Sequence, residues 1–84
     1  MKTNGKGQRI ELGQFIVADP KICHGKPIVR GTRVPVSVVV GSLAAGMTPE
    51  QITREYNVST EDIRAALEFA NSLIEREDYH PLPG

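Results

Sequence analysis

The chain falls into two parts that differ in the spacing of their apolar residues. In the first part, β-prone residues form two short runs, one over residues 9–18 and one around residues 28–30. The dipeptide Asp19-Pro20 ends the first run, because proline fixes its own φ and restricts the residue before it. The two runs predict a two-stranded hairpin with a loop at about residues 19–26. A lone hairpin is marginally stable in water, so we expect it to pack on helices or to pair with another chain.

From Pro35 onward the apolar residues recur at intervals of three and four, which is the period of a helix. Proline is tolerated in a first turn, and Gly46 can adopt the left-handed conformation that ends a helix. The first helix is therefore predicted between these two residues. Its apolar positions are Val36, Val39, Val40, Leu43 and Ala44.

The second helix has a start that can be read directly from the sequence. Thr48 is a good N-cap, Pro49 suits the first helical position, and Gln51 stands three residues after the cap. This capping-box pattern predicts a helix over residues 49–56.

The third helix is the longest. Asn57 tolerates a positive φ and can end the second helix, so Ser59 is free to cap the third. With Asp62 in the first turn, where the helix dipole favours a carboxylate, the helix is predicted from Thr60 to about Glu77. One face of it carries the apolar residues Ile63, Ala66, Leu67, Ala70, Leu73 and Ile74.

Only three residues separate the last two helices, and the apolar Val58 stands in the middle of them. This spacing resembles a helix-turn-helix, in which the second helix can enter the major groove of DNA. An ordinary pair of antiparallel helices is the alternative. The predicted fold class is mainly α: a short β-hairpin followed by a three-helix, homeodomain-like (winged) helix-turn-helix domain.

The chain is short enough for a single domain. We expect a flexible basic arm at residues 1–8, one domain at residues 9–77 with the helix-turn-helix at 49–77, and a loose tail at 78–84. Such a small core gives little net stability, so association with a partner is expected. No apolar run approaches the length that crosses a bilayer, and the single cysteine fits a reducing compartment. The expected location is the cytoplasm, without membrane contact.

The ten basic and ten acidic residues cancel over the whole chain but are unevenly placed. Residues 1–33 carry seven basic side chains against two acidic ones, a net charge of +5, whereas residues 34–84 carry three against eight, a net charge of −5. This division suggests an anionic polymer at the basic half and a basic partner protein at the acidic half. Self-association of opposite halves is the alternative.

Phosphate attraction dominates affinity for nucleic acid, so the basic arm and hairpin are the expected DNA-binding parts. The start of the third helix carries more carboxylates than cations, which is unusual for a helix that reads DNA. Arg30 and Arg33 can face phosphate or form salt bridges to the acidic helices. The expected DNA-binding residues are Lys2, Lys6, Arg9, Lys26, Arg30, Arg33, Thr60 and Arg64. The residues expected to bind the partner protein are Glu68, Glu75, Glu77 and Asp78.

The stretch "CHGKPIVRGTRVPV" combines several chemically active residue types, but no complete catalytic or metal set. Adjacent side chains on an extended strand point to opposite faces, which is poor geometry for Cys23 and His24 as nucleophile and base. A structural zinc needs four ligands, and a phosphate-binding loop needs a Gly-Lys-Ser/Thr sequence that opens a helix. We expect Cys23 to be a small apolar plug, and Gly25 and Gly31 to serve a loop and a bulge. No enzyme activity, cofactor or metal is expected.

The core "GKPIVRGTRVPV", preceded by "DPKIC" and followed by "GMTPEQITREY" and "STEDIRAALEFA", resembles domain of unknown function 433. The similarity covers about residues 14–76. This family of small prokaryotic proteins is similar in fold to homeodomain-like or winged helix-turn-helix proteins. Its members often look like VapB-type antitoxins paired with PIN-like ribonuclease toxins.

The resemblance implies an antitoxin of a type II toxin-antitoxin pair that forms a homodimer. It would bind a PIN-like ribonuclease toxin, and it would bind the double-stranded DNA of its own promoter as an autorepressor. The alternative is a non-enzymatic protein-interaction module with an unused helix-turn-helix shape, which the acidic third helix favours.

Overall fold

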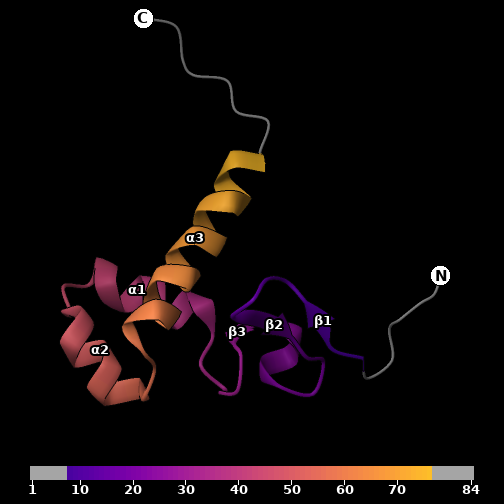
Figure 1. Cartoon of the computed structure of the whole chain (residues 1–84), viewed down its shortest axis with the longest axis horizontal. Helices are drawn as coiled ribbons and strands as arrows, with labels where there is room; N and C mark the ends of the chain where they lie inside the picture. Colours follow the sequence, from indigo (N-terminus) through magenta and orange to yellow (C-terminus); the bar gives the residue numbers. More distant parts are fainter. Residues whose placement is uncertain (1–7, 77–84) are drawn as a thin grey trace, which may run out of the picture.

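The computed structural model describes residues 8–76 of the 84-residue chain. Short strands come first and three helices follow, with α1 and α2 on one side, the strands on the other, and α3 rising away from both (Figure 1). The expected mainly helical chain with a short antiparallel β element is confirmed. In chain order the elements are β1 (Ile10–Glu11), β2 (Ile16–Ala18), the one-turn helix η1 (Cys23–Gly25), β3 (Pro27–Val29), α1 (Val36–Ala44), α2 (Pro49–Tyr56) and α3 (Thr60–Arg76).

The β element has three strands, so the prediction of a two-stranded hairpin was wrong. The first apolar run is divided by a tight turn, in which the Leu12 backbone N–H donates to the Ile16 carbonyl over 2.9 Å. Gly13 and Gln14 lie in this turn, and the apolar residues on either side hid the break in the sequence pattern. The described strands form an antiparallel sheet in the order β1-β2-β3, with Val17 opposite Ile28 at its centre. The loop at residues 19–26 lies between β2 and β3, as predicted.

The two faces of the sheet have different neighbours. Ile16 and Val29 belong to the main core, together with apolar residues of all three helices. Val17 and Ile28 are only 1% exposed, yet they lie outside that core. Because side chains alternate along a strand, these two residues face the other side of the sheet. The main core consists of Ile16, Val29, Val36, Val39, Ile52, Val58, Ile63 and Ala66.

The first two helices have the predicted bounds, and α2 has the predicted cap. The Gln51 backbone N–H donates to Thr48 Oγ1 over 3.1 Å, and the Thr48 backbone N–H donates to Gln51 Oε1 over 2.8 Å. Asn57 ends α2 with a φ of 58°. The next residue, Val58, is buried between α2 and α3, as its position in the sequence suggested.

The third helix is capped as predicted but is only half covered by the core. Ser59 and Asp62 exchange reciprocal hydrogen bonds of 2.9 and 3.0 Å at its start. Further along the predicted apolar face, Leu67, Leu73 and Ile74 are 43%, 45% and 65% exposed. At about 1.5 Å per residue, the 17 residues of α3 span roughly 25 Å, while the nine residues of α1 beside it span roughly 14 Å. The helix therefore extends beyond the core that covers its first half.

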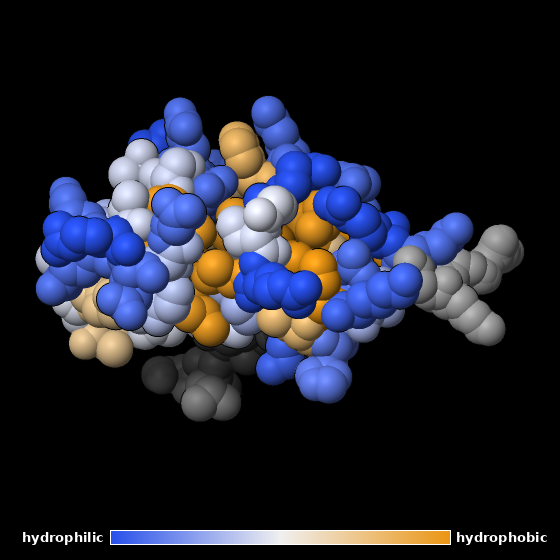
Figure 2. All heavy atoms as spheres, turned by 90° about the horizontal axis from the view of Figure 1, so that it is seen from below, coloured by the Kyte–Doolittle hydropathy of each residue, from blue (hydrophilic) through white to orange (hydrophobic). Residues whose placement is uncertain are grey.

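On the face opposite the free end of α3, apolar residues lie in small patches between charged side chains (Figure 2). Within residues 8–76, no helix is long and apolar enough to cross a membrane.

Candidate functional site

The turn after β3 sets the geometry of the basic residues. Gly31 has a φ of 80°, a conformation that favours glycine. Thr32 closes the turn, because its Oγ1 donates to the Val29 carbonyl over 2.8 Å and accepts from the Val34 backbone N–H over 2.9 Å. The Val29 backbone N–H in turn donates to the Val34 carbonyl over 2.9 Å. This small network fixes the backbone on both sides of Arg33.

Arg30 precedes this turn, and its guanidinium holds the turn between β1 and β2. Its Nε donates to the Gln14 carbonyl over 2.8 Å, and its Nη2 donates to the Gly13 carbonyl over 3.3 Å. The same group forms an ion pair with the Glu11 carboxylate. Arg30 is therefore in a salt bridge, but the partner is on β1 and not on the acidic helices that the sequence suggested.

The ion pair also affects the acidity of Glu11. The hydrogen bond from Arg30 lowers the pKa of this carboxyl below its ordinary value, and the positive charges of Arg30 and Arg9 act in the same direction. Desolvation of the carboxyl opposes these effects without reversing them. Glu11 consequently stays ionised, and paired with Arg30, to a lower pH than a free glutamate would.

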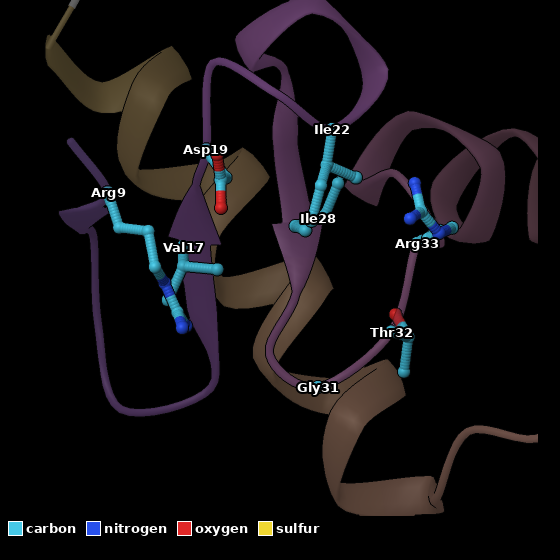
Figure 3. A pocket seen from close by; sticks show the side chains of 8 residues that line it. All are labelled: Arg9, Val17, Asp19, Ile22, Ile28, Gly31, Thr32 and Arg33. Atoms are coloured by element: carbon cyan, nitrogen blue, oxygen red, sulfur yellow. The ribbon is translucent and has the colours of Figure 1, made fainter. Parts of the chain in front are cut away.

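Arg9 and Arg33 behave differently from Arg30, because they line a common pocket of about 260 Å³. Figure 3 shows the two side chains on opposite sides of the pocket, with Val17 and Ile28 between them. Neither arginine has a salt bridge within residues 8–76. The remaining lining residues are Asp19, Ile22, Gly31 and Thr32.

The floor of this pocket is apolar and its sides are charged. Two guanidinium groups face one carboxylate, that of Asp19, whose Oδ1 already accepts a hydrogen bond from the Lys21 backbone N–H over 2.9 Å. The balance of charge at the pocket is therefore positive. Such a depression suits an anionic group presented by a larger molecule.

The loop between β2 and β3 contains an unusual left-handed turn. Cys23, His24 and Gly25 have φ values of 51°, 57° and 82°. The left-handed conformation costs roughly 1–2 kcal/mol for each residue with a Cβ, so Cys23 and His24 are strained here. Cys23 and His24 thus lie in the loop expected at residues 19–26 and not on an extended strand, and Cys23 is not the buried apolar plug that was expected. The half-buried Cys23 Sγ instead donates to the Arg33 carbonyl over 3.3 Å, which ties the loop to the backbone of a pocket arginine.

The other predicted binding residues do not line the pocket. Lys26 lies at an apolar groove beside α1 and α3, and Glu68 lies in a depression next to the β1–β2 turn. Thr60 and Arg64 are exposed on the first turns of α3, and Glu75 is exposed near its end. Four predicted residues, Lys2, Lys6, Glu77 and Asp78, lie outside the described residues.

The sequence placed Arg9 and Arg33 among the expected DNA-binding residues, but it did not predict the pocket that they share. Arg9 and Arg33 are far apart in the sequence, and only the pairing of β1 with β2 and of β2 with β3 brings them to one surface. Val17 and Ile28 had a usable signal, because their neighbours in each strand face the core and alternation then places them on the other face. Among the described residues, no group of three His, Cys, Asp or Glu side chains is arranged to hold a metal ion.

Comparisons with known proteins identify a matching family and two relatives of similar sequence. The model of a family described as "Protein of unknown function (DUF433)" matches residues 16–70. The chain is 38% identical over 60 residues to "Uncharacterized protein y4eO" of Sinorhizobium fredii, and 36% identical over 63 residues to "Putative antitoxin VapB45" of Mycobacterium tuberculosis. Each match covers 70% of this chain, but only 27% and 26% of the two relatives.

A solved structure is also similar. The crystal structure of Rv2018 from Mycobacterium tuberculosis aligns with a TM-score of 0.64 and 35% sequence identity, over 70% of this chain and 29% of that one. The matched part of the chain thus corresponds to 26–29% of the length of these proteins.

Proposed function

The chain belongs to the DUF433 family, and from that premise we propose that it is the antitoxin of a type II toxin-antitoxin pair. In this role it binds a PIN-like ribonuclease toxin and represses its own promoter in the cytoplasm. The observation that carries the proposal is the 36% identity to a protein named as a VapB antitoxin. The protein itself would act by binding alone and would catalyse no reaction.

The DNA-binding part of the proposal rests on the pocket between Arg9 and Arg33. Both guanidinium groups are exposed and without a salt bridge within residues 8–76, so they can approach backbone phosphates without breaking an internal contact. α2 and α3, joined through the buried Val58, would act as the helix-turn-helix, with Thr60 and Arg64 near base edges. Lys2, Lys6 and Lys26 would add phosphate contacts.

Arg30 has a different place in this proposal. Its guanidinium already serves Glu11 and two backbone carbonyls, so it would support the β1–β2 turn and contribute little to phosphate binding. Arg30, which the sequence suggested as a DNA-binding residue, is thus proposed to stabilise the β1–β2 turn instead.

The toxin-binding part of the proposal uses the acidic side of α3. Glu68 and Glu75 are seven residues apart, which places them along one side of the helix, and both are exposed. This acidic row would attract a basic surface of the toxin. The other acidic residues assigned to toxin binding, Glu77 and Asp78, follow α3 in the sequence.

Two measurements test the proposal. In a gel-shift experiment, the purified protein should retard DNA from upstream of its own gene at low salt, and the shift should weaken as salt rises. In a co-expression experiment, the tagged protein should retain the product of the neighbouring gene and suppress its ribonuclease activity. If neither DNA nor the neighbouring product is bound at micromolar concentration, the antitoxin proposal fails.

A second function is favoured by one observation, the charge at the start of α3. Glu61 and Glu68 outnumber the one cation, Arg64, on the part of the helix that would face DNA. This excess of carboxylates opposes binding to DNA phosphates, but it is compatible with a protein-interaction module that does not use its helix-turn-helix shape. It would retain the neighbouring product in the co-expression experiment while leaving promoter DNA unshifted.

A further inference from the structure

An apolar groove of about 390 Å³ lies between β3, α1 and α3. Apart from Lys26 and Ser37, the described side chains that line it are apolar. α3 forms one wall of the groove, and the last residue of that wall, Leu73, is 45% exposed. Part of this apolar surface is therefore left uncovered by residues 8–76. The apolar lining residues are Pro27, Val36, Val40, Phe69, Ala70 and Leu73.

The chain continues beyond α3 with a segment that is long enough to reach this groove. Leu73 lies three residues before Arg76, the last residue of α3, and Phe69 lies seven residues before it. These two groove residues are therefore roughly 5 and 10 Å from the end of the helix, measured along its axis. Residues 77–84 add eight residues, which span up to about 26 Å when extended. This length allows the chain to turn and run back along the groove.

We propose that the 77–84 segment binds in this groove of its own chain and covers it. Proline disfavours a helical conformation in the residue before it, so the two prolines of the segment favour an extended backbone. Extended segments that contain proline bind in grooves lined by aromatic side chains, and Phe69 supplies an aromatic side chain here. The apolar residues of the segment are Tyr79, Pro81, Leu82 and Pro83.

Charge and tethering both favour this segment over another occupant. The segment carries Glu77 and Asp78 but no lysine or arginine, whereas the one charged residue among the described lining residues is Lys26. A segment that is attached by a short connection has an effective concentration of about a millimolar. A contact with a dissociation constant of about 1 mM would then form in about half of the molecules. The same segment on another molecule, at about 1 µM, would fill the groove in about one molecule in a thousand.

The inference does not depend on the antitoxin proposal, because it concerns the protein without DNA or toxin. Its consequence is that the groove is covered from within the chain. An apolar segment of a partner protein would have to compete with the 77–84 segment for the same surface.

Disulfide trapping in the full-length chain tests where the segment lies. In a Cys23→Ser background, the pair Ser37→Cys/Leu82→Cys places one thiol at the groove and one on the segment. The control pair is Asn71→Cys/Leu82→Cys, because Asn71 is exposed but lies about 160° around α3 from the groove residue Phe69. Under mild oxidation, the groove pair should form its disulfide within the monomer at least tenfold faster than the control pair.

The control is stringent because of its position in the sequence. Asn71 is only eleven residues from Leu82, whereas Ser37 is forty-five residues away. A segment that does not bind in the groove would therefore react faster in the control pair. Equal rates, or a faster control pair, overturn the proposal. A disulfide that forms mainly between two molecules also overturns it, because the groove would then hold the segment of a second copy.

Binding of the apolar dye Nile red tests whether the segment covers the groove. Leu82→Ser should raise the fluorescence of the dye about twofold, because the segment would no longer occupy the groove in half of the molecules. The matched control is Leu67→Ser, which removes the same side chain from an exposed position that does not line the groove. This control should leave the fluorescence unchanged or lower it. The proposal fails if Leu82→Ser does not raise the fluorescence, or if both variants raise it equally.

Discussion

The double variant Arg9→Gln/Arg33→Gln should lose most of the affinity for promoter DNA without losing the fold. These two residues flank one pocket, and neither is in a salt bridge within the described residues. Each would therefore contribute a phosphate contact without the loss of an internal one. The substitution to glutamine keeps much of the length of the side chain and removes the charge.

The expected size follows from counterion release. Each phosphate contact contributes about 0.9 to the slope of log K against log salt, so two contacts contribute about 1.8. At a salt concentration of about 0.1 M the dissociation constant of the double variant should be roughly 60-fold larger than that of the wild type. This corresponds to a loss of about 2.4 kcal/mol of binding free energy. The loss should shrink toward zero as the salt concentration approaches about 1 M, because screening removes the same contribution from the wild type.

Fluorescence anisotropy with a labelled promoter duplex, at four or five salt concentrations, measures both quantities. The matched control is Arg54→Gln/Arg76→Gln, which removes the same charge from exposed positions on α2 and α3. It should change the slope by much less than the double variant at the pocket. If the pocket variant keeps the wild-type slope, or if the control variant loses as much affinity as the pocket variant, net charge and not this pocket governs DNA binding.

Three further predictions concern the β1–β2 turn and the cap between α2 and α3. Arg30→Met should lower the free energy of unfolding by about 1 kcal/mol, measured in urea, because it leaves Gly13 and Gln14 without their donor; an unchanged midpoint would contradict the supporting role. Glu11→Gln should reduce the loss of stability between neutral and acid pH. The wild-type carboxyl has a lowered pKa in the folded chain, so its contribution is present above the unfolded pKa and is lost as pH falls through the folded one. Equal acid profiles would refute this. Asn57→Ala should cost about 1 kcal/mol, because the short polar side chain of asparagine tolerates a φ of 58° and that of alanine does not. Asn57→Gly should cost less, because glycine has no Cβ to oppose this φ; calorimetry that ranks the two variants in reverse would count against the cap.

The helices could be predicted closely because their ends depend on neighbouring residues. Thr48 with Gln51, and Ser59 with Asp62, form reciprocal hydrogen bonds over three residues, and Asn57 needs only its own backbone conformation. Such signals involve residues close together in the chain, so they can be recognised in the sequence. The strands were harder, since Gly13 and Gln14 turn the chain within what looked like one continuous apolar run.

The site could be predicted only as a set of charges. Arg9, Arg30 and Arg33 looked equivalent in the sequence, but the sheet separates Arg30 from the other two and gives it Glu11. The half-covered α3 was also hidden, because helical periodicity shows which side is apolar and not how far the neighbouring helix reaches. The environment of each arginine and the exposed length of α3 both depend on contacts between residues that are far apart in the sequence.

The ion pair between Arg30 and Glu11 has a consequence for how binding experiments are interpreted. β1 is two residues long and pairs only with β2 among the described strands, and Arg9 immediately precedes it. A substitution of Arg30 would remove its contacts to Glu11 and to the β1–β2 turn. β1 would then be held less firmly, and Arg9 could move away from the pocket. An alanine scan would then score Arg30 as a binding residue even if its guanidinium only holds Glu11 and the β1–β2 turn. A stability measurement on the same variant would separate the loss of a ligand contact from the loss of this support.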